Sequence, residues 1–267
     1  MKIKLFNTIA IAAMLVASTQ VSANIMGYTT IGNSGVSTTN DGAVIIPSGF
    51  TSVNWISTSG GVNGNNGGYG GTDGSTVTSD VFSSAAGSPL TFSFDFITSD
   101  GTTTYPDYAY ANLYSSLNNL IATLFTATTN PSGSAVPGTG AGLPAISATI
   151  NPSNVVITTG AGSTTWSPLG GYSGKCYGGF GAGCGNTGWV DASYAIASAG
   201  DYYLKFGVAN AGDTAYDTGL AFVGAQVGGT PIGNTNGGGT VPEPASLALF
   251  GIGLAGLSAV RRRKQKA

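Results

Sequence analysis

Thr91-Phe92-Ser93-Phe94-Asp95-Phe96 is the stretch that decides the fold. Its three phenylalanines alternate with polar residues, and successive side chains of a β-strand point to opposite faces. The pattern therefore predicts a strand with one face in a core and the other toward water. Residues 202–208 alternate in the same way, whereas residues 219–227 are apolar on both parities, which predicts a strand covered on both faces.

Further short runs of β-branched and aromatic residues are separated by Gly, Asn, Asp, Ser and Pro. They predict strands at residues 43–46, 52–56, 77–82, 108–114, 120–126, 155–158 and 189–194. Only residues 109–127 offer a helical alternative between the two ends of the chain, and their composition favours strands. We expect an all-β fold, a single antiparallel β-sandwich or jelly-roll-like domain, with an N-terminal signal helix and a C-terminal transmembrane helix.

Glycine-rich segments mark the loops and the linker. Residues 59–75 and 129–144 are low in complexity and predict surface loops, either tolerated insertions or ligand-touching loops. We expect the sandwich to span residues 24–228, followed by a flexible Gly-rich linker at residues 229–240.

The N-terminal segment, residues 1–23, has two lysines, an apolar run and the ending Val21-Ser22-Ala23. This arrangement is typical of a signal peptide, cut by signal peptidase between Ala23 and Asn24. The alternative is a membrane anchor, which the short apolar run disfavours, because a bilayer-spanning helix needs about 20 apolar residues.

The C-terminal segment, residues 241–267, combines Pro242-Glu243-Pro244, an apolar run at residues 245–260 and a basic tail at residues 261–267. By itself this could be a permanent anchor with its basic end on the cytoplasmic side. The order of the three parts resembles the PEP-CTERM sorting signal. The resemblance implies transient anchoring in the inner membrane of a Gram-negative bacterium, cutting by exosortase near the tripeptide, and secretion or display at the cell surface.

A second resemblance lies in the body. Residues 181–190, 203–210 and 213–222, which include Phe206-Gly207-Val208-Ala209-Asn210 and Asp217-Thr218-Gly219-Leu220-Ala221-Phe222, look like a recurring ectodomain of PEP-CTERM proteins. Residues 94–101 and 108–109 resemble its earlier half. The resemblance implies a sandwich without an assigned activity. The chain departs from the pattern at Val223-Gly224, where related chains often carry an Asp after the Phe.

Composition excludes several functions. The chain has no His, and between Asn24 and Thr240 it has ten Asp, no Glu and two Lys. Catalysis by Ser/His/Asp or Cys/His is therefore excluded, and a nucleic-acid surface, which needs clustered Lys or Arg, is not expected. No motif selects a pair of carboxylates for glycoside hydrolysis, so we expect no enzyme activity.

Two kinds of site remain as hypotheses beside the disulfide. An oxidising compartment favours a disulfide between Cys176 and Cys184, the only cysteines. Calcium prefers carboxylate oxygens, and its candidate ligands are Asp95, Asp107, Asp213 and Asp217. The alternative is that these aspartates cap turns.

Aromatic residues beside polar, Gly-rich stretches are candidates for stacking on sugar rings. They are Tyr69, Trp166, Tyr172 and Tyr177. The alternative is that aromatic residues such as Trp55 and Trp189 lie in the core and the tyrosines cover the sandwich edges.

These observations lead to two functional hypotheses. The first is an exported, exosortase-processed, non-catalytic protein of the surface or of an exopolysaccharide matrix. The second is a calcium-assisted carbohydrate-binding module. No cofactor other than calcium is expected.

Overall fold

Two antiparallel β-sheets form the body of the protein. The structure is a computed structural model and describes residues 25–130, 133–138, 142–180 and 183–233. The strands of the first sheet are β1 (Tyr28–Ile31), β4 (Val62–Asn63), β5 (Asp73–Ser79), β6 (Phe82–Ser84), β8 (Tyr108–Ser115), β9 (Leu120–Thr128) and β13 (Gly200–Ala209). The strands of the second sheet are β2 (Asn33–Ser37), β3 (Val53–Ser57), β7 (Pro89–Thr98), β10 (Thr149–Asn151), β11 (Gly185–Asn186), β12 (Val190–Ala195), β14 (Thr218–Val227) and β15 (Thr230–Pro231).

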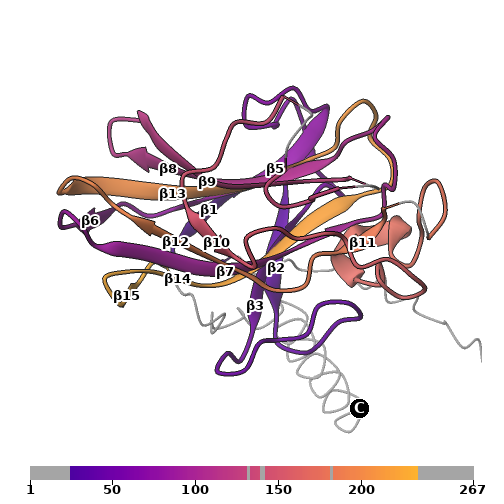
Figure 1. The fold of residues 1–267 in the computed structure, drawn as a ribbon, viewed down its shortest axis with the longest axis horizontal. Coiled ribbons are helices and arrows are strands. Elements are labelled where there is room, and N and C mark those ends of the chain that lie inside the picture. Colours follow the sequence, from indigo (N-terminus) through magenta and orange to yellow (C-terminus); the bar gives the residue numbers. More distant parts are fainter. Residues whose placement is uncertain (1–24, 131–132, 139–141, 181–182, 234–267) are drawn as a thin grey trace, which may run out of the picture.

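The sheets pack face to face, as Figure 1 shows. The first has the order β1-β5-β13-β8-β9, and the second has the order β10-β12-β7-β14-β3-β2. The short strands β4, β6, β11 and β15 pair with β5, β13, β7 and β14. The predicted all-β fold and its two antiparallel sheets are confirmed.

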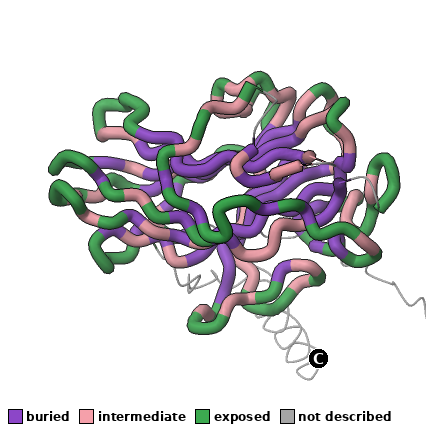
Figure 2. The backbone as a smooth tube through the Cα atoms, viewed as in Figure 1, coloured by how far each residue is buried: buried purple, intermediate pink, exposed green. Residues whose placement is uncertain are grey.

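Aromatic side chains fill the space between the sheets. Phe92, Phe94 and Phe96 of β7 are buried, as their spacing predicts. The ring of Phe94 stacks on that of Phe125 from the first sheet, with 3.7 Å between centroids. Phe206 and Phe222 likewise stack across the two sheets at 4.3 Å. Each buried ring contributes about 1.5–3 kcal/mol through the area removed from water. Figure 2 shows the buried strands in the middle and the exposed loops around them.

A second, smaller core covers part of the outer face of the second sheet. The short 3-10 helix η1 (Ser167–Tyr172) brings Leu169 onto β14, and Trp166 packs beside it. Gly219 lies directly under the Trp166 ring, where a Cβ atom would collide with Cζ3. Strand β14 is therefore covered on both faces, as its sequence predicts.

Several predicted elements differ in the structure. Residues 43–46 form no strand, because Val44 packs against Trp166 in the outer-face core instead of joining a ladder. Residues 155–158 make only isolated bridges, and residues 77–82 are divided between β5 and β6. Within the predicted linker, Thr230–Pro231 form β15, which pairs with β14, and Ile232 is buried in the main core.

The membrane-associated predictions concern the two ends of the chain. The signal peptide and the predicted transmembrane helix at residues 245–260 lie outside the described residues. Within the described ranges, no helix has the length and apolar character needed to cross a bilayer.

Candidate functional site

Strand ends from both sheets meet at one end of the sandwich and bring several aspartates together. Ala209, the last residue of β13, lies opposite both Tyr108 of β8 and Gly74 of β5. Asp107 and Asn210, which adjoin these strand ends, and Asp73 at the start of β5 are therefore neighbours. In the second sheet, Thr218 lies opposite Thr98, which places Asp217 and Asp100 at the same end. We call this region, with Asp213 of the β13–β14 loop, the acidic end.

Asp107 is fully buried at the acidic end. The Thr218 hydroxyl donates to its Oδ2 at 2.7 Å, and the backbone N–H of Ala211 donates to its Oδ1 at 2.9 Å. Burial raises the pKa of Asp107 well above its usual range, and the nearby negative charges of Asp100 and Asp213 raise it further. Burial therefore makes the carboxylate form of Asp107 costly unless a nearby cation compensates its charge.

Three other aspartates of the acidic end, Asp73, Asp100 and Asp217, also have raised pKa values. Burial raises the pKa of Asp100 to about 6, and the Asp213 charge adds to this shift. The pKa values of Asp73 and Asp217 are also raised, chiefly by burial. The Asn210 side-chain N–H donates to Asp73 Oδ1 at 3.2 Å, which partly offsets this effect.

Two buried oxygen atoms of this region lack a hydrogen-bond partner among the described residues. They are Asp100 Oδ2 and Asn210 Oδ1, and both side chains are fully buried. Buried polar atoms are normally paired, so each calls for an explanation, such as a bound ion or water. Of the two lysines of the described ranges, Lys175 lies over the Tyr172 ring, and Lys205 of β13 lies opposite Asn112 of β8.

The predicted calcium ligands are only partly brought together. Asp107, Asp213 and Asp217 lie at the acidic end, whereas Asp95 lies on β7, where Thr187 donates to its Oδ1 at 3.1 Å. Among the described residues, no three acidic side chains converge closely enough to hold a metal ion on their own. Any calcium ion at the acidic end would need neutral oxygen ligands as well, and Asn210 Oδ1 is of the type that calcium accepts.

Sequence reasoning missed Asp73, Asp100 and Asn210 as members of the acidic end. Asp73-Gly74 and Asp100-Gly101 have the composition of ordinary turns, which hides their position. The signal that could have found the two aspartates is their position: each lies at or beside the end of a strand. Strand ends gather at the ends of a sandwich.

A cluster of tyrosines adjoins the acidic end. The Tyr216 ring lies 4.8 Å from that of Tyr172 and 5.0 Å from that of Tyr177, which in turn contacts Tyr105 at 5.6 Å. Tyr216 has φ 58°, a left-handed conformation that few residues other than glycine adopt. Such conformations persist where surrounding structure imposes them, and they cluster at functional sites.

The structure places the predicted stacking residues in different surroundings. Tyr172 and Tyr177 both belong to the tyrosine cluster, and Tyr177 is exposed. Tyr69 packs edge-on against Tyr110 with 5.2 Å between centroids, and its hydroxyl is hydrogen-bonded to Asn112. The prediction for Trp166 is wrong, because its side chain is 1% exposed and belongs to the outer-face core.

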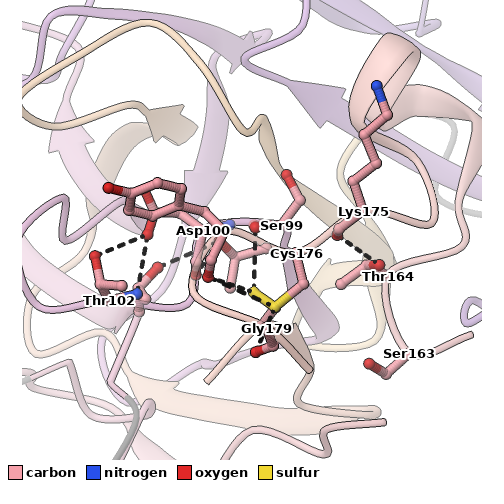
Figure 3. Close-up of a disulfide and its surroundings, with 12 residues drawn as sticks. Ser99, Asp100, Thr102, Ser163, Thr164, Lys175, Cys176 and Gly179 are labelled. Atoms are coloured by element: carbon pink, nitrogen blue, oxygen red, sulfur yellow. Dashed lines mark hydrogen bonds between the residues drawn. A yellow bond between two sulfur atoms is a disulfide. The ribbon is translucent and has the colours of Figure 1, made fainter. Parts of the chain in front are cut away.

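The predicted disulfide between Cys176 and Cys184 is present, with 5.6 Å between the Cα atoms. Figure 3 shows it beside Ser99 and Asp100 at the end of β7. The backbone N–H of Tyr177 donates to the Ser99 carbonyl at 2.9 Å, so the bridged loop is attached to the acidic end. The disulfide thereby helps to fix the position of Tyr177.

The tail of the chain gives the identification. The fold defines an all-β sandwich protein, and residues 240–264 match the PEP-CTERM protein-sorting motif. The chain therefore carries the sorting signal of an exosortase-targeted exported protein, as Pro242, Glu243 and Pro244 predict. These residues and the predicted cleavage at Ala23–Asn24 lie outside the described ranges.

Comparison with other proteins adds only distant likenesses. No curated protein matches the chain. The enzymatically active domain of tailspike protein 4 from bacteriophage CBA120 is similar at 13% identity and TM-score 0.33, over 77% of this chain and 19% of that chain. The K3 cleaved adhesin domain of Lys-gingipain from Porphyromonas gingivalis is similar at 10% identity and TM-score 0.32, over 75% and 90% of the two chains. The protein spans about a fifth of the tailspike chain, and neither likeness bears on function.

Proposed function

We propose that this protein is released outside a Gram-negative cell by exosortase and acts there without catalysis, as a component of the surface or of an exopolysaccharide matrix. The observation that supports the proposal is the PEP-CTERM motif at residues 240–264. Export begins with the signal peptide, which signal peptidase cuts between Ala23 and Asn24. The inner membrane holds the chain only transiently, through residues 245–260.

The composition of the body supports a binding or structural role. The segment from Asn24 to Thr240 is rich in Ser, Thr and Gly and contains only two lysines, so it suits contact with hydroxyl-rich polymers better than with nucleic acids. The disulfide at Cys176–Cys184 suits an oxidising compartment outside the cytoplasm.

The test is the intact mass of the protein recovered from the medium of an exosortase-bearing bacterium. The proposal expects a product that starts at Asn24, ends near Pro242 and contains no free thiol. Replacing Pro242, Glu243 and Pro244 together by Ala should retain the uncut chain in the membrane fraction. Ser83→Ala, a change in the body, is the control and should leave release unchanged. Equal release of both variants would contradict the proposal.

A second candidate function is carbohydrate binding assisted by calcium at the acidic end. The observation that favours it is the pair of unpartnered buried oxygens, Asp100 Oδ2 and Asn210 Oδ1, among mutually repelling carboxylates. A cation would satisfy these atoms and lower the pKa values of the surrounding carboxyl groups. The tyrosine cluster beside it would supply rings for stacking on a sugar.

Thermal unfolding with calcium or with EDTA tests the second candidate. Calcium at about one hundred times its Kd would add about 2.7 kcal/mol of stability, and EDTA would remove it. Asp100→Asn should abolish the response, whereas Asp80→Asn, a change of an exposed aspartate, should preserve it. An identical Tm of the wild-type protein in calcium and in EDTA would rule out this candidate.

A further inference from the structure

The outer face of the second sheet carries a groove away from the acidic end. It has a volume of about 600 Å³, within the range of about 300–1,000 Å³ that is usual for ligand pockets. Strands β7, β10, β12 and β14 form its floor. Thr91 and Ser93 of β7 point into it, because Phe92 and Phe94 point the other way, into the core.

The strand register arranges the polar side chains of the floor in two rows that cross the strands. One row follows from the pairs Gln226–Thr91, Thr91–Ser193 and Ser193–Thr149. The other follows from the pairs Ser93–Asp191 and Asp191–Asn151. Neighbouring strands lie about 4.8 Å apart, so each row offers hydroxyl, amide or carboxylate groups at that repeat.

Hydrogen bonds within the rows hold some of these groups in place. The Ser93 hydroxyl donates to Asp191 Oδ1 at 2.6 Å, and the Gln226 amide donates to Thr91 Oγ1 at 3.1 Å. These two hydrogen bonds do not use Asp191 Oδ2 or Gln226 Oε1, which can therefore accept hydrogen bonds from a ligand. The groove thus presents fixed acceptors and donors, which reduces the entropy lost when a ligand binds.

An aromatic ring forms one wall of the groove. Strand β14 has a bulge between Val223 and Gln226, and Gly224 within it has φ 68°. A Cβ atom at Gly224 would lie 3.0 Å from Phe50 Cζ, so the absence of a side chain there lets the Phe50 ring approach the sheet. Phe50 is only half-buried, and its ring is a surface on which a sugar can stack.

We propose that this groove binds an extended, neutral oligosaccharide across the strands, with Phe50 stacked on a sugar ring and the two polar rows hydrogen-bonded to its hydroxyl groups. The row spacing is comparable with the repeat of sugar units in an extended β-linked polysaccharide. The lining residues include one charged side chain, Asp191, and no cation, which disfavours acidic polymers. The inference deepens the proposed extracellular role by assigning its partner, and it does not require calcium.

Isothermal titration of the processed, secreted protein tests the proposal. The probes are the neutral β-linked hexasaccharides cellohexaose, laminarihexaose and xylohexaose, each with EDTA present. At least one probe should bind saturably, and Phe50→Ala should weaken its binding about tenfold, as expected for loss of one stacking contact. Phe50→Trp should restore binding. Ser193→Arg, on the exposed floor, should block the groove independently of Phe50.

Phe180→Ala is the matched control, because it removes an exposed aromatic ring that does not line the groove. It should leave binding unchanged, and each variant should melt close to the wild-type protein. The groove proposal is wrong if no probe binds at millimolar concentration, or if binding survives both Phe50→Ala and Ser193→Arg. It is also wrong if Tyr177→Ala abolishes binding, which would assign the ligand to the tyrosine cluster. None of these outcomes affects exosortase release, which the mass measurement tests separately.

Discussion

Thr218 of the second sheet donates a hydrogen bond of 2.7 Å to the buried carboxyl group of Asp107, which precedes the first-sheet strand β8. The Thr218 hydroxyl also lies 2.8 Å from that of Thr98. The hydrogen bond from Thr218 to Asp107 joins the two sheets at the acidic end, whereas the contact with Thr98 lies within the second sheet. The bond between the sheets makes Asp107 a structural residue there, whether or not a cation binds nearby.

Asp107→Asn should preserve or increase the free energy of unfolding at pH 8. The amide can still accept a hydrogen bond from the Ala211 N–H and can donate one to Thr218, and the substitution removes a buried charge. Asp107→Ala should lower the free energy of unfolding by about 1–3 kcal/mol, because it leaves buried polar partners unsatisfied. Urea unfolding of both variants measures the difference. Equal stability of the two variants would show that these hydrogen bonds contribute little.

Stability should fall as pH rises from about 4 to 8. Burial raises the pKa of Asp95 to about 7 in the folded protein, so folding favours its protonated form. Its contribution is therefore fully present below the ordinary pKa and is lost as pH rises through about 7, at a cost on the order of 4 kcal/mol. Asp95→Asn should flatten the dependence of Tm on pH. Asp80→Asn, the exposed control, should follow the wild-type curve; a curve for Asp95→Asn as steep as wild type would contradict the assignment.

The disulfide should stabilise the protein by about 2–3 kcal/mol, as expected for closing a short loop. The double variant Cys176→Ala, Cys184→Ala should lose this amount in chemical denaturation. The wild-type protein under reducing conditions is the internal control, and it should approach the stability of the double variant. A reductant that leaves the wild-type unfolding curve unmoved would count against the contribution.

Gly219→Ala should destabilise the protein by about 1–3 kcal/mol, because the added methyl group would collide with the Trp166 ring and overpack the outer-face core. Gly171→Ala is the matched control, since a Cβ atom there meets nothing within 4 Å. Thermal unfolding of both variants, together with the fluorescence of the tryptophans, measures the effect. Indistinguishable melting of the two variants would indicate that the Trp166 ring moves aside freely.

Local alternation was enough to predict the strands that build the main core. The positions of Phe92, Phe94 and Phe96 follow from period two alone, and residues 109–127 form strands as their composition favours. Strand neighbours were not predictable, because nothing in β7 itself shows that it lies between β12 and β14. The short polar strands β1 and β2 were missed because they have no apolar alternation.

The candidate site was predicted less completely than the fold. The sequence showed that aspartates are abundant, but only the pairing of strand ends separates Asp95 from Asp107 and brings Asp100 and Asn210 to the acidic end. The apolar character of residues 43–46 was recognised, yet its use as a cover over Trp166 depends on tertiary packing. The groove beside Phe50 depends on a bulge at Gly224. In the sequence, the only sign of this bulge is that Val223-Gly224 departs from the pattern of the ectodomain that the chain resembles.

The pairing of β15 with β14 fixes the place where the described part of the chain ends. The Tyr28 hydroxyl donates to the Ile232 carbonyl at 3.3 Å, so the first strand and the last described residues are fastened to each other. Strand β14 runs ten residues from Thr218 to Val227, about 30 Å, and Figure 1 shows β15 and η1 at opposite ends of the sandwich. The described part of the chain therefore ends on the side of the sandwich opposite to η1, whose Tyr172 packs against the Tyr216 ring.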